Sequence, residues 1–514
     1  MLSLRGDYII IILVSKAHPR HSPQMKDIQD IIRRAKEGQD VVSELMAKSV
    51  SVPSWELALK YEYDTRLHPV MDKEKYPDIV LYEERVSETD VDEYGRPKVV
   101  KVATGVEKVS RVTYDLMRLA VKRTTELCFG IPIKRLYKPE KDNEKQKEIA
   151  RYLENIFQRN RINSVNIDRS NKLYSSCEVA TIWYAVREDN NYYGFNSKLK
   201  LRCATYSPMQ GDSIYPLYDE TGDLVALSFK YTRKVADKDV SFFDTYTADT
   251  HIAWSNTGEL GWSLSGQVEP IAIRKIPAAY RFRRQPAWED RAPIVYEMEW
   301  AVSRNGNYLR TNSRPILMAA VNEEVGYGNE PKADAAFRDI VQYPQGSTLQ
   351  YVTWNQAIDN LKFYVEELKQ SFFTQLQLPD WSYENMKTSP MSGEARKQLF
   401  IDCHLKVKDE AGDWIEFFDR EVNVVKAFLK QMLPQDWHND IDALVVENQM
   451  TPYIIDDRKE DAEILLLKNG QKPLMSQRES IQALGESEDV DATLAEIQQE
   501  SAASLVSDAL GLAQ

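Results

Sequence analysis

The chain has 514 residues, of which 43% are hydrophobic, and a formal net charge of −13. This length allows two or more subdomains, each with its own apolar core. The acidic balance argues against a protein that grips nucleic acid by neutralising phosphates, although it permits one that contacts DNA without adhering to it.

An apolar run over residues 8–14 lies near the N-terminus, but it is too short to span a bilayer. Only Arg5 precedes this run and no small-residue cleavage site is obvious, so a secretion signal is not indicated. Residues 1–24 are interpreted as a flexible arm or as the product of a start site assigned too far upstream. A helix is predicted to follow over residues 25–48.

A hairpin and a helix are predicted next. Residues 79–102 contain strongly polar strands about a turn at Tyr94-Gly95-Arg96-Pro97, which predicts a hairpin. Residues 109–126 carry apolar side chains at helical spacing, and Phe129-Gly130-Ile131-Pro132 provides a firm stop for that helix.

Two further helices, over residues 141–159 and from there to Tyr174, lead into a β-rich segment at 176–284. In that segment, Val225, Leu227, Phe229 and Tyr231 alternate with smaller or polar residues. This alternation predicts a half-buried strand.

A basic cluster that includes Arg281, Arg283 and Arg284 ends the β-rich segment, and the aromatic residues Tyr280 and Phe282 alternate with these cations. Cations interleaved with aromatic rings are one signature of a nucleic-acid patch. The favoured alternative is pairing with the acidic tail or other carboxylates between subunits, because arginine is common at interfaces and the chain is rich in acid.

The segment that follows is the most informative part of the chain. A helix is predicted from residues 290–293 to the pre-proline residue Arg314. Its second half carries Asn305, Asn307 and Asn312, from which a helix gains nothing. A helix packed against copies of itself beside a wet channel could use them.

A second helix of similar length is predicted over residues 355–376, after a small α/β insertion. The acidic pairs Glu297/Glu299 and Glu366/Glu367 could form acid–base dyads. However, residues one or two apart on a helix face different sides, so solvated or channel-facing positions are favoured.

A loop at residues 378–392 separates the second helix from a third, very long one of about 40 residues that starts at Gly393. Such a length exceeds that of most globular helices and predicts an extended partner surface. The tail from Asp456 contains 13 acidic and 5 basic residues and is predicted to form short helices.

No motif of a catalytic or cofactor site is present. Phosphate-binding loops and the HExxH, GxSxG and EF-hand patterns are missing from the sequence. The four cysteines are widely spaced, which predicts free thiols in a reducing compartment. His18 and His21 are neighbours but have no further ligand near them. We therefore expect no catalytic residue, no cofactor and no metal.

The order of these elements resembles that of the portal proteins of tailed double-stranded-DNA bacteriophages. Besides the two helices around the insertion, four segments carry the resemblance: Phe129-Gly130-Ile131-Pro132, residues 171–184, Ser392-Gly393-Glu394-Ala395 and residues 475–500. The similarity covers residues 26–500. The apolar N-terminal arm matches no segment of the portal proteins, and the chain after Glu500 is short.

The resemblance implies an α+β portal fold with a wing, a two-helix stem, a clip, a tunnel loop and a crown. The expected boundaries are a doubtful N-terminal arm (1–24), a wing with helical and β-rich parts (25–289), stem helix 1 (290–313), a small α/β clip (314–354), stem helix 2 (355–377), a tunnel loop (378–392), a long wing helix and return (393–455), and an acidic helical crown (456–514).

The resemblance also implies a non-enzymatic protein of the virion, assembled in the host bacterial cytoplasm as a ring of about twelve subunits at one capsid vertex. This ring would be a channel for double-stranded DNA during packaging and ejection, without sequence specificity. The implied partners are copies of itself, the terminase large subunit, the major capsid protein and scaffold, and a head-completion or adaptor protein, with no membrane.

Two sets of residues are expected to serve that function. The tunnel-loop residues expected nearest to DNA are Asn385, Met386, Lys387, Thr388 and Ser389. The stem residues expected to line the channel or bridge subunits are Glu297, Glu299, Arg304, Asp359, Lys362, Glu366, Glu367 and Lys369.

Two other classes of protein compete with this interpretation. A soluble α+β enzyme with an unrecognised site would be a compact monomer or dimer, which the very long helix fits poorly. A head–tail adaptor ring would usually be a much shorter chain.

Overall fold

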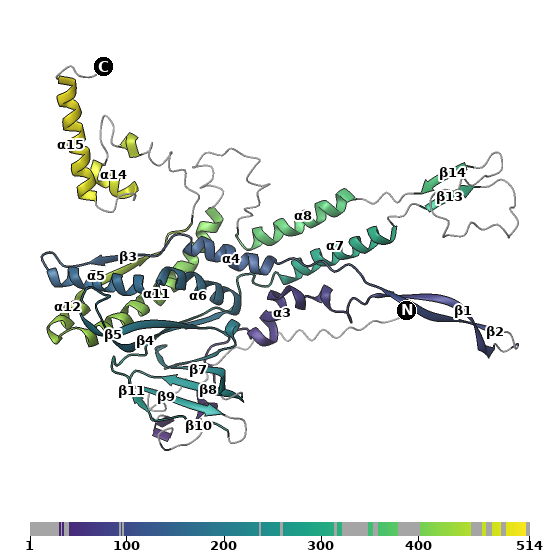
Figure 1. Ribbon diagram of the computed structural model, residues 1–514, viewed down its shortest axis with the longest axis horizontal. Coiled ribbons are helices and arrows are strands. Elements are labelled where there is room, and N and C mark those ends of the chain that lie inside the picture. The colour runs from purple at the N-terminus through teal and green to yellow at the C-terminus, as the bar shows by residue number, and fades with distance from the viewer. Residues whose placement is uncertain are drawn as a thin grey trace.

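In the computed structural model, the chain forms an α+β body from which an arm of two helices and a long β-hairpin extend in the same direction (Figure 1). The structure describes residues 30–31, 33–34, 37, 41–91, 94, 97–235, 238–256, 261–312, 316–320, 348–352, 358–378, 401–453, 465–468, 475–484 and 490–509.

The N-terminal part differs from the predicted helix over residues 25–48. Residues 30, 31, 33 and 34 are helical and α2 covers Val42–Leu45, whereas residues 37, 41 and 46–48 lie outside any helix, so the described residues do not form one continuous helix. The predicted hairpin is confirmed, since β1 (Ile79–Val91) pairs antiparallel with β2 (Pro97–Glu107). Between α2 and β1 lie a short π-helix, the short helix α3 (Lys60–Tyr63) and two 3₁₀ turns.

The predicted helix over residues 109–126 begins later than expected. Helix α4 spans Leu116–Phe129, because residues 108–115 form an extended segment. Helix α4 ends at Phe129, next to the stop that the sequence predicts. A Cβ on Gly130 would lie 2.8 Å from the Tyr453 ring, so the close approach of these two segments requires glycine.

The next two helices, α5 (Glu144–Arg159) and α6 (Ile162–Ser176), confirm the prediction and pack with α4 into the helical layer of the body. Asn143 caps α5 by accepting a hydrogen bond from the Gln146 N–H. At the junction of the two helices, Arg161 has a positive φ of 49°.

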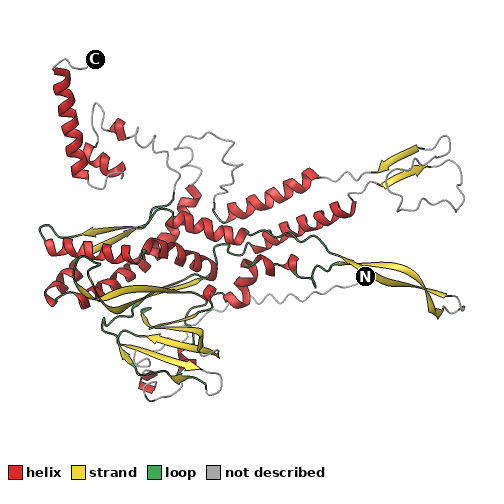
Figure 2. Ribbon diagram, viewed as in Figure 1, coloured by secondary structure: helices red, strands yellow, loops and turns green. Residues whose placement is uncertain are grey.

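The predicted β-rich segment is also confirmed and forms two antiparallel sheets (Figure 2). The first has strand order β12-β4-β5, and the second β10-β9-β8-β7-β6 with β11 paired to β9. The strands are β4 (Glu178–Asn190), β5 (Ser197–Tyr206), β6 (Ser213–Tyr218), β7 (Leu224–Val235), β8 (Lys238–Tyr246), β9 (Thr250–Asn256), β10 (Ser263–Leu264), β11 (Glu269–Pro270) and β12 (Ala278–Phe282).

The arm consists of α7 (Ala292–Asn312) and α8 (Ile358–Gln375), which lie side by side, with the strand pair β13 (Ile316–Ala320) and β14 (Thr348–Val352) at its tip (Figure 1). Both predicted helices are therefore confirmed. The sequence also predicts a helix over residues 331–338 and a strand over residues 340–343 of the insertion, and both lie outside the described residues.

The long helix is confirmed from Ile401 onward as α11 (Ile401–Met432), which runs through the body. Its Trp414, Phe417 and Phe418 join the central core with residues of α4, α6, α7 and α8. Its second half packs on α5, β4 and the short helix α12 (His438–Ala443). After α12, β15 (Val445–Gln449) pairs with β3 (Lys134–Lys138).

The acidic tail contains α14 (Gln477–Leu484) and α15 (Val490–Ala509), and α15 extends beyond the helix predicted over residues 490–499. No helix in the described part of the chain is both long and apolar enough to cross a membrane.

Candidate functional site

The surface of the α7–α8 arm carries charges of both signs. The exposed predicted residues are Glu297, Arg304, Asp359, Lys362, Glu366 and Glu367, and Lys369 is half-buried. Two of their contacts lie along or between the two helices of one chain: Lys362 pairs with Glu366 at 3.9 Å, and the Tyr364 hydroxyl donates to Glu297 over 3.3 Å. Exposed pairs of this kind contribute only about 0 to 1 kcal/mol each.

Glu299 is a correction to the predicted set. Its side chain is completely buried inside the protomer, so it neither lines a channel nor bridges subunits. One carboxylate oxygen accepts hydrogen bonds from the Tyr114 N–H and from His68 Nδ1, each over 2.8 Å. Glu297 and Glu299 face different sides of the helix, as the sequence predicts, but the side that carries Glu299 faces the core.

Glu299 is the first rung of a polar ladder on α7. Four residues later the Ser303 hydroxyl accepts from the Val112 N–H over 2.8 Å, and four residues after that the Asn307 side-chain oxygen accepts from the Ser110 N–H. We call these three side chains the α7 ladder. It holds the extended segment that precedes α4 against the arm.

The three hydrogen bonds of the α7 ladder can form because the spacing of every fourth residue on the helix matches the spacing of every second residue on the extended segment. Four residues of an α-helix rise by roughly 6 Å. Two residues of extended chain advance by roughly 6.6 Å, and alternate N–H groups point to the same side. Gly306 allows the close contact, since a Cβ there would lie 2.9 Å from the Ser110 hydroxyl oxygen.

The ladder changes the interpretation of the asparagines in this helix. Asn307 bonds within its own chain, to Ser110 and to the Tyr76 hydroxyl, so its polarity needs no neighbouring subunit. The side chain of Asn312 lies outside the described residues.

Replacing one rung tests the ladder. Ser303→Ala should lower the free energy of unfolding by about 1–2 kcal/mol, because the Val112 N–H loses its acceptor in a part-buried place. Ser371→Ala is the control, since that hydroxyl accepts from the exposed Gln375 side chain. Urea unfolding compares the two variants, and equal losses would contradict the role of the ladder.

His68 lies buried between two acceptors. Its Nδ1 is 2.8 Å from the Glu299 carboxylate, and its Nε2 is 2.9 Å from the Glu62 carbonyl oxygen. An imidazolium satisfies both contacts as a donor, whereas a neutral ring satisfies only one. Burial opposes the charge, but the hydrogen bond and charge of Glu299 outweigh it, and the pKa of His68 lies above 6.5.

This raised pKa predicts a stability change with pH. The contribution of His68 is complete below its unfolded pKa of 6.5 and is lost as pH rises through the higher folded pKa. Unfolding curves from about pH 6 to about pH 9 should show the wild type losing stability relative to His68→Gln. A constant difference between the two proteins would contradict the charged state of His68.

Two arginines of the basic cluster, Arg281 and Arg283, have carboxylate partners within their own chain. Arg281 donates to Glu410 over 3.2 Å and to Asp413 over 3.0 Å, and Arg283 lies 2.7 Å from Glu410. Both carboxylates belong to α11 of the same chain, so for Arg281 and Arg283 the prediction of carboxylate partners was correct, but these partners are not in a second subunit. Arg284 is exposed beside this contact.

Sequence reasoning missed a buried ion pair that also anchors α11. Glu421 is fully buried, and its two oxygens accept from Arg169 over 2.8 and 3.0 Å. Trp183 donates to the same carboxylate over 3.2 Å. A charged residue on the apolar stripe of the long helix was the available signal, but it does not identify partners 252 residues away.

The described residues hold no group of acidic, histidine or cysteine side chains that could bind a metal. Cys128, Cys177 and Cys403 are buried free thiols, and Cys203 is half-buried. Burial raises the pKa of Cys128 to about 12, which makes it an inert side chain. The predicted tunnel-loop residues, Asn385 to Ser389, lie outside the described residues.

Comparison with known proteins identifies the family. The model of the family described as "Phage portal protein, SPP1 Gp6-like" matches residues 103–505, which is more than half of the chain. This chain belongs to the phage portal protein family. The portal family is a structural, non-enzymatic one, in agreement with the expectation that the chain is not an enzyme.

Solved structures show a weaker likeness to this portal family member. A chain from the neck of an empty gene transfer agent particle is 9% identical, covers 72% of this chain and 88% of its own length, and has a TM-score of 0.37. A chain from the neck of the native particle computed with C12 symmetry is 9% identical, with 87% and 98% covered and a TM-score of 0.35. No curated protein sequence matches significantly, so the assignment rests on the family model.

Proposed function

We propose that this portal family member assembles through its α7–α8 arm into a ring of about twelve subunits at one capsid vertex of the virion. The ring conducts double-stranded DNA during packaging and ejection. In this proposal the arm is the stem, the β13–β14 end is part of the clip, and the segment at residues 378–392 is the tunnel loop. The terminase large subunit, and later a head-completion protein, dock on the ring.

The observation that carries the proposal is that the arm leaves large apolar side chains uncovered. Phe363 is 68% exposed, Leu309 47% and Tyr364 42%, along two helices that project from the body. Apolar residues at this density beside charged ones are typical of a surface that another protein covers. Copies of the same arm, arranged side by side, bury these residues and leave the charged ones to face water.

The net charge fits a conduit for DNA. A ring of about twelve copies carries a formal charge of about −156 before counterions. An acidic lumen repels phosphates, so the duplex moves without the strong attraction that many neutralised phosphates would create. Lys387 in the tunnel loop would place one ring of positive charge at a single height along the channel, which gives a weak contact with the DNA.

Deleting residues 380–389 tests the DNA role separately from assembly. We expect rings with an unchanged number of subunits, and a large decrease in the DNA retained in particles assembled with the deleted protein. Lys387→Ala is a milder variant that keeps the loop length and removes one charge per subunit. If the deletion prevented ring formation, the loop would be a structural element of the ring. If DNA packaging were normal, the proposed contact of the loop with DNA would be wrong.

A further inference from the structure

The β1–β2 hairpin projects from the body without a second layer to cover it (Figure 1). Its strands have 13 and 11 residues, and among the described elements neither strand has an extensive contact with any element except the other. A lone pair of strands is only marginally stable in water, because it has nothing on which to bury its side chains. We therefore expect another surface to cover this hairpin.

One face of the hairpin is apolar near the body. Val80 and Tyr82 share this face because alternate residues of a strand point to the same side, and the register places Val106 opposite Val80. Tyr82 is 60% exposed and Val106 64%. We call Val80, Tyr82 and Val106 the hairpin patch. Large apolar side chains gathered in this way are typical of a surface that a protein partner covers.

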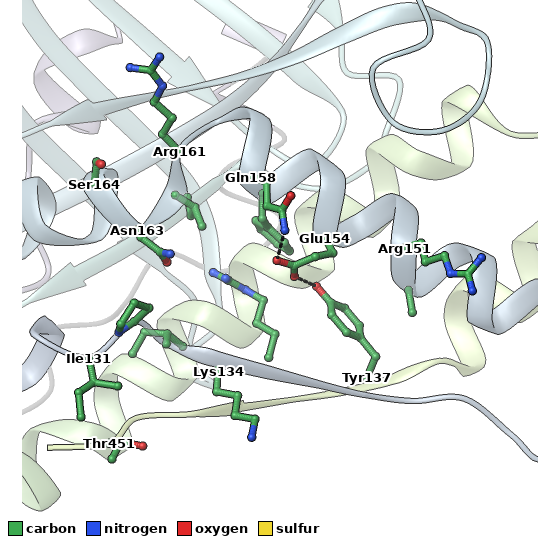
Figure 3. A pocket seen from close by; sticks show the side chains of 16 residues that line it. Ile131, Lys134, Tyr137, Arg151, Glu154, Gln158, Arg161, Asn163, Ser164 and Thr451 are labelled. Carbon is green, nitrogen blue, oxygen red and sulfur yellow. Dashed lines mark hydrogen bonds between the residues drawn. The ribbon is translucent and has the colours of Figure 1, made fainter. Parts of the chain in front are cut away.

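A cleft of the body shows the contrast. Between β3, α5 and the start of α6, the Glu154 carboxylate accepts from the Tyr137 hydroxyl over 3.0 Å and from the Gln158 amide over 3.1 Å (Figure 3). The guanidinium carbon of Arg135 lies 4.1 Å from the centroid of the Phe157 ring. These side chains have partners in their own chain, whereas the hairpin patch is open to solvent.

The base of the hairpin is fixed to the α7–α8 arm. Arg310 of α7 donates to the Lys108 carbonyl oxygen over 2.6 Å, directly after β2. The Tyr76 ring, just before β1, meets the Trp300 ring of α7 edge-on at 5.0 Å. The α7 ladder holds the chain that follows. The hairpin patch is therefore held at a set position beside the arm and is ready for a partner.

Helix α7 separates the hairpin from α8. Its Glu299 bonds the extended segment that leads out of the hairpin, and its Glu297 accepts from Tyr364 of α8. Residues two apart are roughly 200° apart around an α-helix, so these two contacts lie on different sides of α7. The base of the hairpin, α7 and α8 thus form three successive layers, with the hairpin and α8 outermost.

The outer side of α8 carries an uncovered phenylalanine among carboxylates. Val365 packs against the central core, and Phe363, two residues earlier, points the other way and is 68% exposed. Three exposed carboxylates lie three or four residues from Phe363 and so share its side of the helix: Asp359, Glu366 and Glu367. We call this surface the α8 outer face.

We propose that in the ring the hairpin patch of one subunit packs on the α8 outer face of the next subunit. This inference rests on the ring proposed above and names a contact within it. Neighbours in a ring of identical subunits meet through two different surfaces of the same chain. The hairpin and α8 are the two outer layers of each subunit, so the occupant of the hairpin patch is a second copy of this chain.

Charge selects the face of the hairpin that meets α8. Lys101 lies on the face of the hairpin patch, with Glu84 beside it in the register, and the exposed Lys108 follows β2. The opposite face carries Glu83 and Glu107 near the body. An acidic helix surface is therefore attracted more by the patch face than by the opposite one.

The stability of the ring tests the contact. Val106→Ser should raise the protein concentration at which half of the rings dissociate by about tenfold, because a buried apolar contact is lost in every interface. Phe363→Ser should have a similar effect from the other side. Mass photometry over a dilution series measures both. Val235→Ser is the matched control, since Val235 is 50% exposed on β7 of the body, and its rings should dissociate like those of the wild type.

Cross-linking tests the geometry. A chain with both Val106→Cys and Phe363→Cys, treated with a short bifunctional maleimide, should give a ladder of linked subunits on a denaturing gel. Each single variant should give none and measures the background, because three natural cysteines are buried and Cys203 is half-buried. All the substituted side chains are exposed, and far-UV circular dichroism checks that each variant subunit folds.

The outcomes separate this contact from the ring itself. Rings that dissociate equally in Val106→Ser and Val235→Ser overturn the proposal, and so does a linked monomer without a ladder. Hairpin variants that form normal rings but fail to enter capsids would assign the hairpin patch to a capsid protein and also overturn it. Absence of rings in the wild type would instead contradict the proposed ring, and this contact with it.

Discussion

Glu421→Gln should destabilise the protein by about 3–5 kcal/mol, although the two side chains have nearly the same shape. Glu421 is fully buried, and its charge is the direct counter-ion of Arg169 at 2.8 Å and lies 3.9 Å from Arg135. The amide leaves two buried guanidinium groups without a negative partner. Because the bonds join α6 and β4 to the middle of α11, their loss should loosen the whole body.

Urea unfolding at neutral pH measures this effect, and Glu416→Gln, an exposed neighbour on α11, is the matched control with a change within about 0.5 kcal/mol. The effect should depend on pH. Burial by itself raises the pKa of Glu421, but the charges of Arg169 and Arg135 outweigh it and hold the pKa below 4.5. The contribution is therefore present above pH 4.5 and is lost as pH falls through the folded pKa. A loss in Glu421→Gln no larger than that of the control would contradict the ion pair.

Trp414→Ala should cost about 3–5 kcal/mol, the other large effect that the structure predicts. Trp414 is fully buried where α4, α6 and α11 meet, with the Phe129 ring 4.9 Å and the Phe418 ring 5.7 Å away. Its indole N–H donates to the Tyr174 hydroxyl over 3.0 Å, and the guanidinium carbon of Arg281 lies 4.9 Å from its ring.

Trp414→Phe separates volume from hydrogen bonding. It keeps most of the ring contacts and should cost clearly less than alanine, since it loses the bond to Tyr174 and leaves a smaller cavity. Chemical denaturation of both variants provides the comparison. If alanine and phenylalanine cost the same small amount, the core at this junction would be able to close around the gap, contrary to its dense packing.

Much of the fold could be predicted from the sequence because its signals are local. Helices α5, α7, α8 and α11 follow apolar side chains at helical spacing, and the β1–β2 hairpin follows its turn residues. The late start of α4 could not be predicted in this way. The segment before it is extended because α7 binds its N–H groups, and those partners lie about 190 residues away.

The candidate site was predicted less completely, for a related reason. The sequence shows that Glu299 and Arg281 are charged, but not that each has a partner inside the same chain. Asn307 was interpreted as a sign of subunit packing, and its partners are Ser110 and Tyr76. Exposed charges such as Glu366 and Lys362 lie on the surface as predicted. A role for them between subunits remains part of the proposal.

The most direct test of the central claim is the mass of the purified full-length protein under native conditions, measured by native mass spectrometry or mass photometry. The chain has a mass of 59.3 kDa. The proposal predicts one closed assembly of about twelve copies, and ring-shaped particles in electron micrographs of the same sample. Monomers or dimers alone, across the salt and protein concentrations tested, would contradict it.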